Sequence, residues 1–429
     1  IGHPLLQPVL EGFLRLQRQP LTTQACRYLE AAARAVADDE TGAFAPIGAL
    51  GMDSMDRPCP DLEAQQSLLV GVASSLGGGD IPWQVAARAF VSLAAVGPEN
   101  ATELLPTFLD HPNPFVRGYA ARGATLLADR SVLRTLATDA DSNVRTAALS
   151  GLFSLDGHAI DVLLVEALAS DDPQLLLTVA GLLEGTPAPD VAADAALDAF
   201  LRISAAERET WRDPRRALLG LLATTGRAEQ APALEPYLAD YDPLVARDVA
   251  ALLTRWTGRQ RTADPTPLPR EPLPSARELR AMDGAIVRLH MEGGGTIDIG
   301  LRPYLATTNA YRFFRLAREG YFDGLTFHRW APNFVLQGGS PAANEYQGAA
   351  AFSRDEVGLA PHWRGTVGIS TRGHDTGDAQ IFINLLDNVR LDHTYTVVGS
   401  VVAGMETVDR TMDGAVIERA EVIPGGDGA

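Results

Sequence analysis

The stretch GYFDGLTFHRWAPNFVLQGGSP, residues 320–341, decides the fold of the last third of this 429-residue chain. Two further stretches have the same pattern of apolar runs and glycines: RGTVGISTRGHDTGDAQIFINL at 364–385 and LDHTYTVVGSVVAGMETVD at 391–409. All three are short apolar runs between glycine-rich loops, which predicts short strands. Upstream, AIVRLHM and TIDIGL flank the turn EGGG and predict a β-hairpin, and a helix is predicted from Thr308 to Glu319, with Gly320 as its C-terminal cap. This pattern predicts a closed β-barrel with flanking helices.

The three stretches resemble the cyclophilins, whose pattern FHR-x-x-P-x-F-x-x-QGG is met at residues 327–339. The resemblance covers about one third of the chain and places a cyclophilin-like domain at 277–429. It implies peptidyl-prolyl cis–trans isomerase activity on X–Pro bonds of polypeptides, assisting protein folding or assembly. It implies no cofactor, and no His, Cys or carboxylate spacing in the chain supports a metal site.

The chemistry explains why these residue types occur together. An X–Pro bond rotates over a barrier of roughly 18–20 kcal/mol because rotation breaks amide resonance. A catalyst therefore needs an apolar slot for the proline ring and a donor that favours the twisted amide. The resemblance makes Arg329 the donor to the prolyl nitrogen, and gives Gln337 and Phe334 catalytic positions beside it. The implied substrate-binding residues are Phe382, Gln380, Leu391, Tyr395, Val335, Ser370 and Thr371.

Several positions depart from the family pattern. Arg390 stands where many cyclophilins have a tryptophan at the rim, Ser370-Thr371 replace an Ala-Asn pair, and Val335 replaces a methionine. The loop 340–353 has few glycines, so we expect a different pocket entrance. The alternative to an enzyme is a non-catalytic proline-binding or scaffold subunit of a larger assembly.

Before residue 258, apolar residues recur at helical spacing, and the segments repeat. Helices with Asp, Asn or Ser as the N-cap, often followed by proline, recur every 29 to 41 residues, with aligned positions at Pro82, Pro114, Asn143, Pro173, Pro214 and Pro243. Second helical segments such as TELLPTFL and SVLRTLAT lie between them. A two-helix period of this size predicts an α-solenoid over 1–257, with HEAT-like repeats. Such a surface predicts a partner or client protein on the repeats.

The segment 258–276 carries five prolines, which predicts a polyproline linker acting as a semi-rigid spacer between two folding units. The net charge of −18 argues against nucleic acid, and no apolar run is long enough to predict a membrane span. Cys26 and Cys59 are compatible with either a disulfide or two free thiols. The start at Ile1, without methionine, suggests processing and mildly favours the bacterial cell envelope over the cytoplasm.

Overall fold

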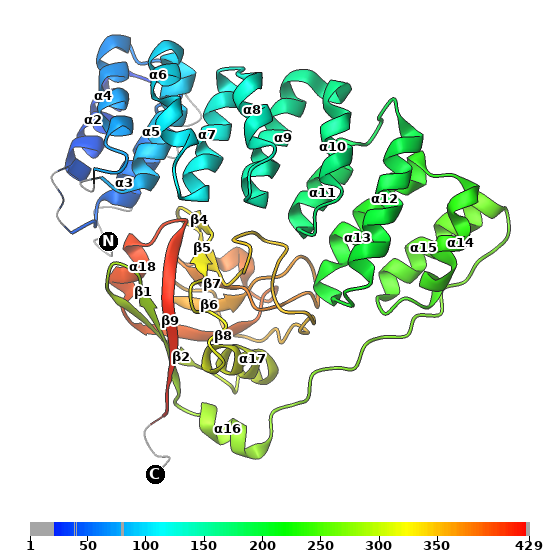
Figure 1. The fold of residues 1–429 in the computed structure, drawn as a ribbon. Helices are drawn as coiled ribbons and strands as arrows, with labels where there is room; N and C mark the ends of the chain where they lie inside the picture. The colour runs from blue at the N-terminus through cyan, green and yellow to red at the C-terminus, as the bar shows by residue number, and fades with distance from the viewer. Residues whose placement is uncertain (1–20, 38, 40, 79–80, 426–429) are drawn as a thin grey trace.

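A computed structural model describes residues 21–37, 39, 41–78 and 81–425, and Figure 1 shows their arrangement. Helices fill the first part of the chain and stack side by side in an arc above a β-barrel. The helices of this solenoid are α2 (Thr23–Ala37), α3 (Ala45–Asp53), α4 (Leu62–Ser74), α5 (Trp83–Val96), α6 (Pro98–Leu109), α7 (Pro114–Leu126), α8 (Arg130–Leu136), α9 (Ser142–Asp156), α10 (Asp161–Ala167), α11 (Pro173–Leu182), α12 (Pro189–Ser204), α13 (Arg212–Thr225), α14 (Ala231–Leu234) and α15 (Pro243–Thr257).

Side-chain caps start most of the repeating helices, as the sequence predicts. Asn113, Asp172 and Asp242 each accept a hydrogen bond from a backbone N–H in the first turn of α7, α11 or α15, and a proline follows each of them. Three of the aligned helices depart from the predicted cap. Helix α5 follows Pro82 and has no side-chain cap. Asp141, rather than Ser142, caps α9. Asp213 lies inside the first turn of α13, which begins at Arg212, so its carboxylate is available for another contact.

Alternate helices of the solenoid pack directly on one another, in the series α5, α7, α9, α11, α13 and α15. Close approach depends on small residues at the crossings. A Cβ at Gly123 of α7 would lie 2.3 Å from the Phe90 ring of α5, and a Cβ at Gly151 of α9 would lie 2.2 Å from Thr125 Oγ1 of α7. The repeats thereby bury one continuous apolar core. By length and composition alone the stretch Ser142–Ala167 could cross a membrane, and 39% of its most apolar window is buried inside the protein.

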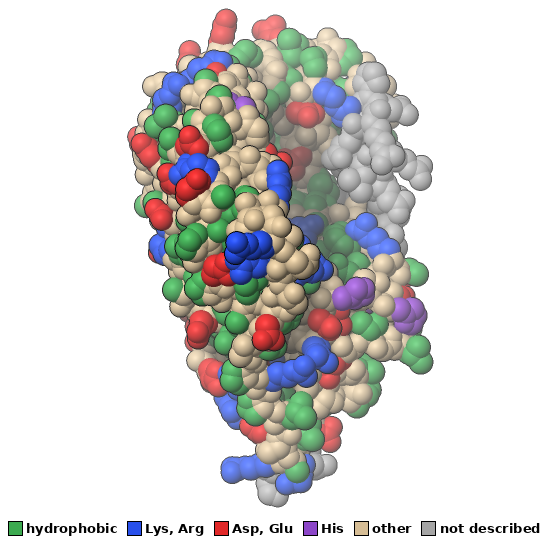
Figure 2. All heavy atoms as spheres, turned by 90° about the vertical axis from the view of Figure 1, so that its right-hand side faces the viewer, with side chains coloured by type: hydrophobic (Ala, Val, Ile, Leu, Met, Phe, Trp, Pro, Cys, Tyr) green, Lys and Arg blue, Asp and Glu red, His purple; other side chains and the backbone are tan. Residues whose placement is uncertain are grey.

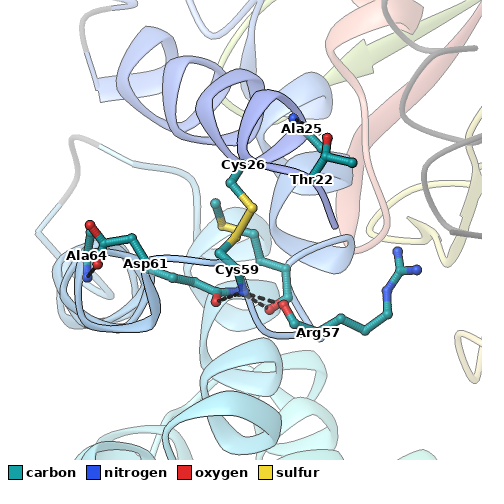
Figure 3. The surroundings of a disulfide bond; sticks show 9 residues. Thr22, Ala25, Cys26, Arg57, Cys59, Asp61 and Ala64 are labelled. Atoms are coloured by element: carbon teal, nitrogen blue, oxygen red, sulfur yellow. Dashed lines mark hydrogen bonds between the residues drawn. A yellow bond between two sulfur atoms is a disulfide. The ribbon is translucent and has the colours of Figure 1, made fainter. Parts of the chain in front are cut away.

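Cys26 and Cys59 form a disulfide, which the sequence left open. Figure 3 shows the bond joining α2 to the segment that precedes α4, with the two Cα atoms 6.1 Å apart. Gln65 holds the Cys59 side of the bond, because its Oε1 accepts the Cys59 backbone N–H at 2.8 Å. In the chain-entropy account, a loop of 33 residues makes such a bond worth about 3–4 kcal/mol. The predicted repeats at residues 1–20 lie outside the described residues.

The second part of the chain is a nine-stranded antiparallel sheet that curls into a nearly closed barrel. Its strand order is β3-β9-β1-β2-β8-β6-β7-β5-β4, and a bridge between Thr326 and Ser340 links β3 to the end of β5. The predicted helix is α17 (Thr307–Arg318), one residue earlier at each end, and Gly320 follows it at φ 73°. The other elements are α16 (Ala276–Met282), α18 (Met405–Arg410), β1 (Ile286–Met291), β2 (Thr296–Leu301), β3 (Thr326–Phe327), β4 (Arg329–Ala331), β5 (Val335–Gly338), β6 (Thr366–Ile369), β7 (Ile381–Asn384), β8 (Val397–Ala403) and β9 (Ala415–Ile423).

The solenoid and the barrel are docked, so the prediction of a spacer that holds them apart is wrong. The segment between α15 and α16 runs around the outside of the molecule without helix or strand (Figure 1). The N-terminal halves of α5 and α9 meet the barrel loops: Arg88 of α5 binds Asp413, and Asn143 of α9 donates to the Ala342 carbonyl at 2.8 Å. The carboxylate of Asp213, free of a capping role, binds the Arg372 guanidinium at 3.0 Å.

Candidate active site

The predicted site lies on the outer surface of three adjacent strands. In the antiparallel register Arg329 of β4 faces Gln337 of β5, and Gln337 faces Phe382 of β7. Because side chains alternate along a strand, these three point to one face. Leu336 and Ile383, one residue away from Gln337 and Phe382, point the other way into the barrel core. The barrel core therefore fixes the strands that present the site.

An apolar slot is formed by Val335, Phe382 and Leu391, a buried cluster separate from the barrel core. The rings of Phe334 and Tyr395 pack against it, and the Tyr395 ring meets the Phe382 ring edge-on at 5.7 Å. These five residues come from three separate loops and strands. Together they enclose an apolar surface of the kind that a proline ring fills.

The slot opens into a cavity of about 200 Å³ with a polar side. Its lining contains nine of the ten predicted site residues: Arg329, Phe334, Val335, Gln337, Ser370, Thr371, Phe382, Leu391 and Tyr395. These predicted residues are spread over 67 positions of the sequence, from Arg329 to Tyr395. In the folded chain they line one cavity. We call this cavity the proline pocket.

A hydrogen-bond chain runs along the polar side of the proline pocket. Arg329 Nη1 donates to Gln337 Oε1 at 3.0 Å, and Gln337 Nε2 donates to Ser370 Oγ at 3.0 Å and to Gln380 Oε1 at 3.1 Å. The Gln337 side chain is buried, whereas 44% of the Arg329 side chain is exposed. The glutamine therefore holds one edge of the guanidinium, and the rest of it faces the cavity opening.

Comparison with known proteins adds the decisive observation. Residues 286–424 match the family model of the cyclophilin type peptidyl-prolyl cis-trans isomerase/CLD. Peptidyl-prolyl cis-trans isomerase B of Bacillus subtilis is 35% identical over 134 residues, which span 31% of this chain and 94% of that protein. The chain belongs to the cyclophilin family. Peptidyl-prolyl cis-trans isomerase ppi1 of Schizosaccharomyces pombe is 35% identical over 121 residues, 27% of this chain and 78% of that protein.

A further similar protein is a peptidyl-prolyl cis-trans isomerase of Helicobacter pylori strain ATCC 700392 / 26695. It is 36% identical over 110 residues, which cover 25% of this chain and 68% of that protein. The match to the family model leaves out the whole solenoid.

Gln380 is the predicted site residue that lies outside the lining of the proline pocket. It is buried behind Gln337, and its Nε2 donates to the backbone carbonyls of Glu345 at 3.1 Å and Gln347 at 2.8 Å. Both ends of this amide are engaged, the oxygen by Gln337 and the nitrogen by the loop 340–353. In this cyclophilin domain Gln380 ties that loop to the site.

Two lining residues were not among the predicted ones, Glu345 and Arg372. Glu345 Oε1 lies 3.3 Å from Arg329 Nη1, so a carboxylate faces the guanidinium. Arg372 Nη1 donates to the Glu345 carbonyl at 2.6 Å. The low glycine content of the loop 340–353 indicated a changed entrance, but a sequence pattern gives no indication of which carboxylate would reach Arg329. The departure at Arg390 is also explained, because its guanidinium lies 4.0 Å from the centre of the Phe334 ring.

Two histidines beneath the site, His328 and His362, have lowered pKa values. Burial first, and then the positive charge of Arg329, lower the pKa of His328 to about 4. Burial also lowers the pKa of His362, whose ring lies parallel to Phe382 at 6.0 Å and whose Nδ1 is 3.2 Å from Asp392. Both rings are therefore neutral at pH 7, and His362 supports the slot from behind. In the described part of the chain, no group of three His, Cys, Asp or Glu side chains could hold a metal ion.

Proposed function

We propose that the proline pocket catalyses cis–trans isomerisation of X–Pro bonds in polypeptides, with Arg329 as the catalytic residue. The observation that carries the proposal is an apolar slot that suits a proline ring, directly beside the half-exposed side chain of Arg329. The ring of the substrate proline enters between Phe382, Leu391 and Phe334. The prolyl nitrogen then lies toward Arg329.

Catalysis follows from the difference between the planar and the twisted amide. In the planar amide the nitrogen lone pair is delocalised, and in the twisted transition state it becomes a hydrogen-bond acceptor. A donor aimed at that nitrogen therefore stabilises the transition state more than the ground state. Both protein contacts of the Arg329 guanidinium use Nη1. Among the described residues none accepts a hydrogen bond from its Nε or Nη2, which leaves these donors for the substrate.

Arg329→Ala tests this role against the alternative of a non-catalytic proline-binding module. The matched control is Arg302→Ala, an exposed arginine of the same domain outside the pocket lining. We expect kcat/KM for a short X–Pro peptide to fall by roughly 100-fold in Arg329→Ala, the lower range for losing one transition-state donor. The affinity for the peptide should change little. An intact chain that binds the peptide but has no activity would instead establish the binding module.

We further propose that the solenoid binds the client polypeptide for the isomerase. The N-terminal halves of its inner helices are occupied by the cyclophilin domain, which favours joint use of one surface over a separate partner on the concave side. The face in Figure 2 carries basic and acidic side chains interspersed, so it offers no single-sign patch to a highly charged partner. Photo-crosslinking of a proline-containing polypeptide to the full chain tests this, because labels confined to residues 286–424 would contradict it.

We propose an oxidising compartment for the protein, in a bacterium the cell envelope. The Cys26–Cys59 disulfide supports this, because such bonds persist mainly outside the reducing cytosol. Alkylation of the denatured protein, taken directly from its host, should find both thiols blocked. Two reactive thiols would count against this compartment.

A further inference from the structure

A second and larger cavity lies between the solenoid and the cyclophilin domain, beside the contacts that dock them. Its volume is about 820 Å³, and its walls come from α7 and α9 on one side and from the barrel loops on the other. We call it the interdomain cleft. It shares two lining residues with the proline pocket, Arg329 and Glu345. The cleft and the proline pocket therefore adjoin at the Arg329–Glu345 pair, which lines both of them.

The solenoid wall of the cleft is built to accept a backbone. The small residues Gly118, Ala147, Ser150 and Ser154 lie in this wall among larger side chains such as Phe115 and Leu126. The hydroxyl groups of three lining residues donate their hydrogens to carbonyls of their own helices: Thr125 to Ala121, Thr146 to Ser142 and Ser154 to Gly151. Their oxygen lone pairs can still accept N–H groups from an extended chain. Small residues and acceptors in one wall fit a polypeptide segment.

The cleft lining holds two arginines, and Arg329 is paired with Glu345 of the same lining. Arg122 is exposed and its guanidinium lies 4.7 Å from the centre of the Tyr119 ring. No carboxylate of the described residues pairs with it within 4.0 Å. By contrast, Asp141 caps α9 and Asp413 binds both Arg88 and Tyr119. A carboxylate on the bound segment would therefore meet a cation that has no competing partner.

The cleft is bordered by fixed contacts between the loop 340–353 and the solenoid. Asn344 Nδ2 donates to Asp172 Oδ2 at 3.1 Å, and Asn143 binds the same loop, so the loop 340–353 is held against α9 and α11. His328 lines the cleft next to Arg329, but both of its ring nitrogens are buried away from the cleft surface.

We propose that the interdomain cleft is an extended substrate site, which binds the residues flanking the isomerised X–Pro bond and selects an acidic side chain through Arg122. This rests on the proposed isomerase function of the proline pocket. The occupant is the substrate polypeptide itself, because Arg329 lines both the cleft and the proline pocket. The solenoid is thereby part of the enzyme's specificity.

The test compares peptides on the full-length protein. A short X–Pro peptide fills only the proline pocket, and a set of longer peptides of equal length carries one Glu at successive positions on either side of the proline. A parallel set carries Lys in place of Glu. The variants are Arg122→Glu, which reverses the charge, and Ser150→Trp, which fills the cleft. Arg134→Ala is the control, because Arg134 is exposed on α8 and lines neither cavity.

The wild type should favour one Glu position by about fivefold in kcat/KM over the Lys peptide, the size of one charge-assisted contact in a partly solvated cleft. Arg122→Glu should reverse that preference, and Ser150→Trp should reduce activity on all long peptides. Activity on the short peptide should stay unchanged in both variants. Equal values for Glu and Lys peptides at every position would overturn the proposal while leaving the isomerase intact. A wild type without activity on the short peptide would instead contradict the proposed isomerase function itself.

Discussion

His328 should make the stability of the cyclophilin domain depend on pH. Its ring nitrogens are buried beside Arg329, and its pKa is lowered from 6.5 to about 4. In the unfolded chain the ring binds a proton near pH 6.5, whereas the folded chain resists protonation until about pH 4. The unfolded state therefore binds more protons in this window, so the stability is complete above pH 6.5 and is lost as the pH falls toward 4.

The magnitude follows from the two pKa values. At about 1.4 kcal/mol for each tenfold change in proton affinity, a pKa of about 4 in place of 6.5 costs about 3 kcal/mol once the pH is below both values. At pH 5 the linkage relation gives about 2 kcal/mol, because the unfolded ring is then almost fully protonated and the folded ring is not. A loss of this size is a large fraction of the stability of an ordinary domain.

The assay compares the wild type with His328→Phe, which keeps an aromatic ring of similar shape without the titrating group. Denaturant unfolding of the cyclophilin domain is followed at pH 7.5 and pH 5.0 in the full chain. His362 and the other histidines titrate in both proteins, so the difference between the two losses isolates His328. We expect the wild type to lose about 2 kcal/mol more than His328→Phe. Equal losses, or an NMR titration of the His328 ring with a midpoint near 6.5, would refute the reasoning.

Two further perturbations test the interface and the pocket. Asp413→Ala should destabilise the docking of the two domains by about 3 kcal/mol, because it leaves the buried Arg88 guanidinium without one of its partners. Hydrogen exchange of the amides at the interface measures this loss. The control is Asp190→Ala, which breaks an exposed pair and should have no comparable effect. Glu345→Gln should raise kcat/KM on a short X–Pro peptide by about twofold to fivefold, because the carboxylate no longer competes with the substrate for Arg329. A decrease in kcat/KM would show that Glu345 orients the guanidinium instead.

The proline pocket could be predicted from the sequence because its residues are set by local pattern and strand register. Arg329, Gln337 and Phe382 belong to short strands whose alternation sends them to one face, and apolar neighbours such as Leu336 fix that face. The repeating helices could also be predicted, since most carry a side-chain cap and each carries apolar residues at helical spacing. In both parts of the chain, interactions within an element or between adjacent elements carry the information.

The docking could not be predicted, because it depends on pairs distant in sequence with no local pattern. Asp213 followed by proline looks like another helix cap, yet its carboxylate binds Arg372, 159 residues away. The linker composition correctly excluded helix and strand, but an extended linker is compatible with docked as well as separated domains. The sequence likewise predicts Gln380 as a substrate-binding residue, because no local pattern indicates that its amide donates to the Gln347 carbonyl of the loop 340–353.

The loop 340–353 connects the solenoid to the chemistry of the proline pocket. Two solenoid residues hold this loop near Glu345. The Oε1 of Gln174 accepts the Glu345 N–H at 3.3 Å, and Asp172 accepts a hydrogen bond from the side chain of Asn344. The side chain of the same Glu345 faces the guanidinium of Arg329. A shift of α11 would therefore move a negative charge relative to the proposed catalytic donor. Glu345 is therefore the residue through which a change in the solenoid would reach the proposed catalytic donor.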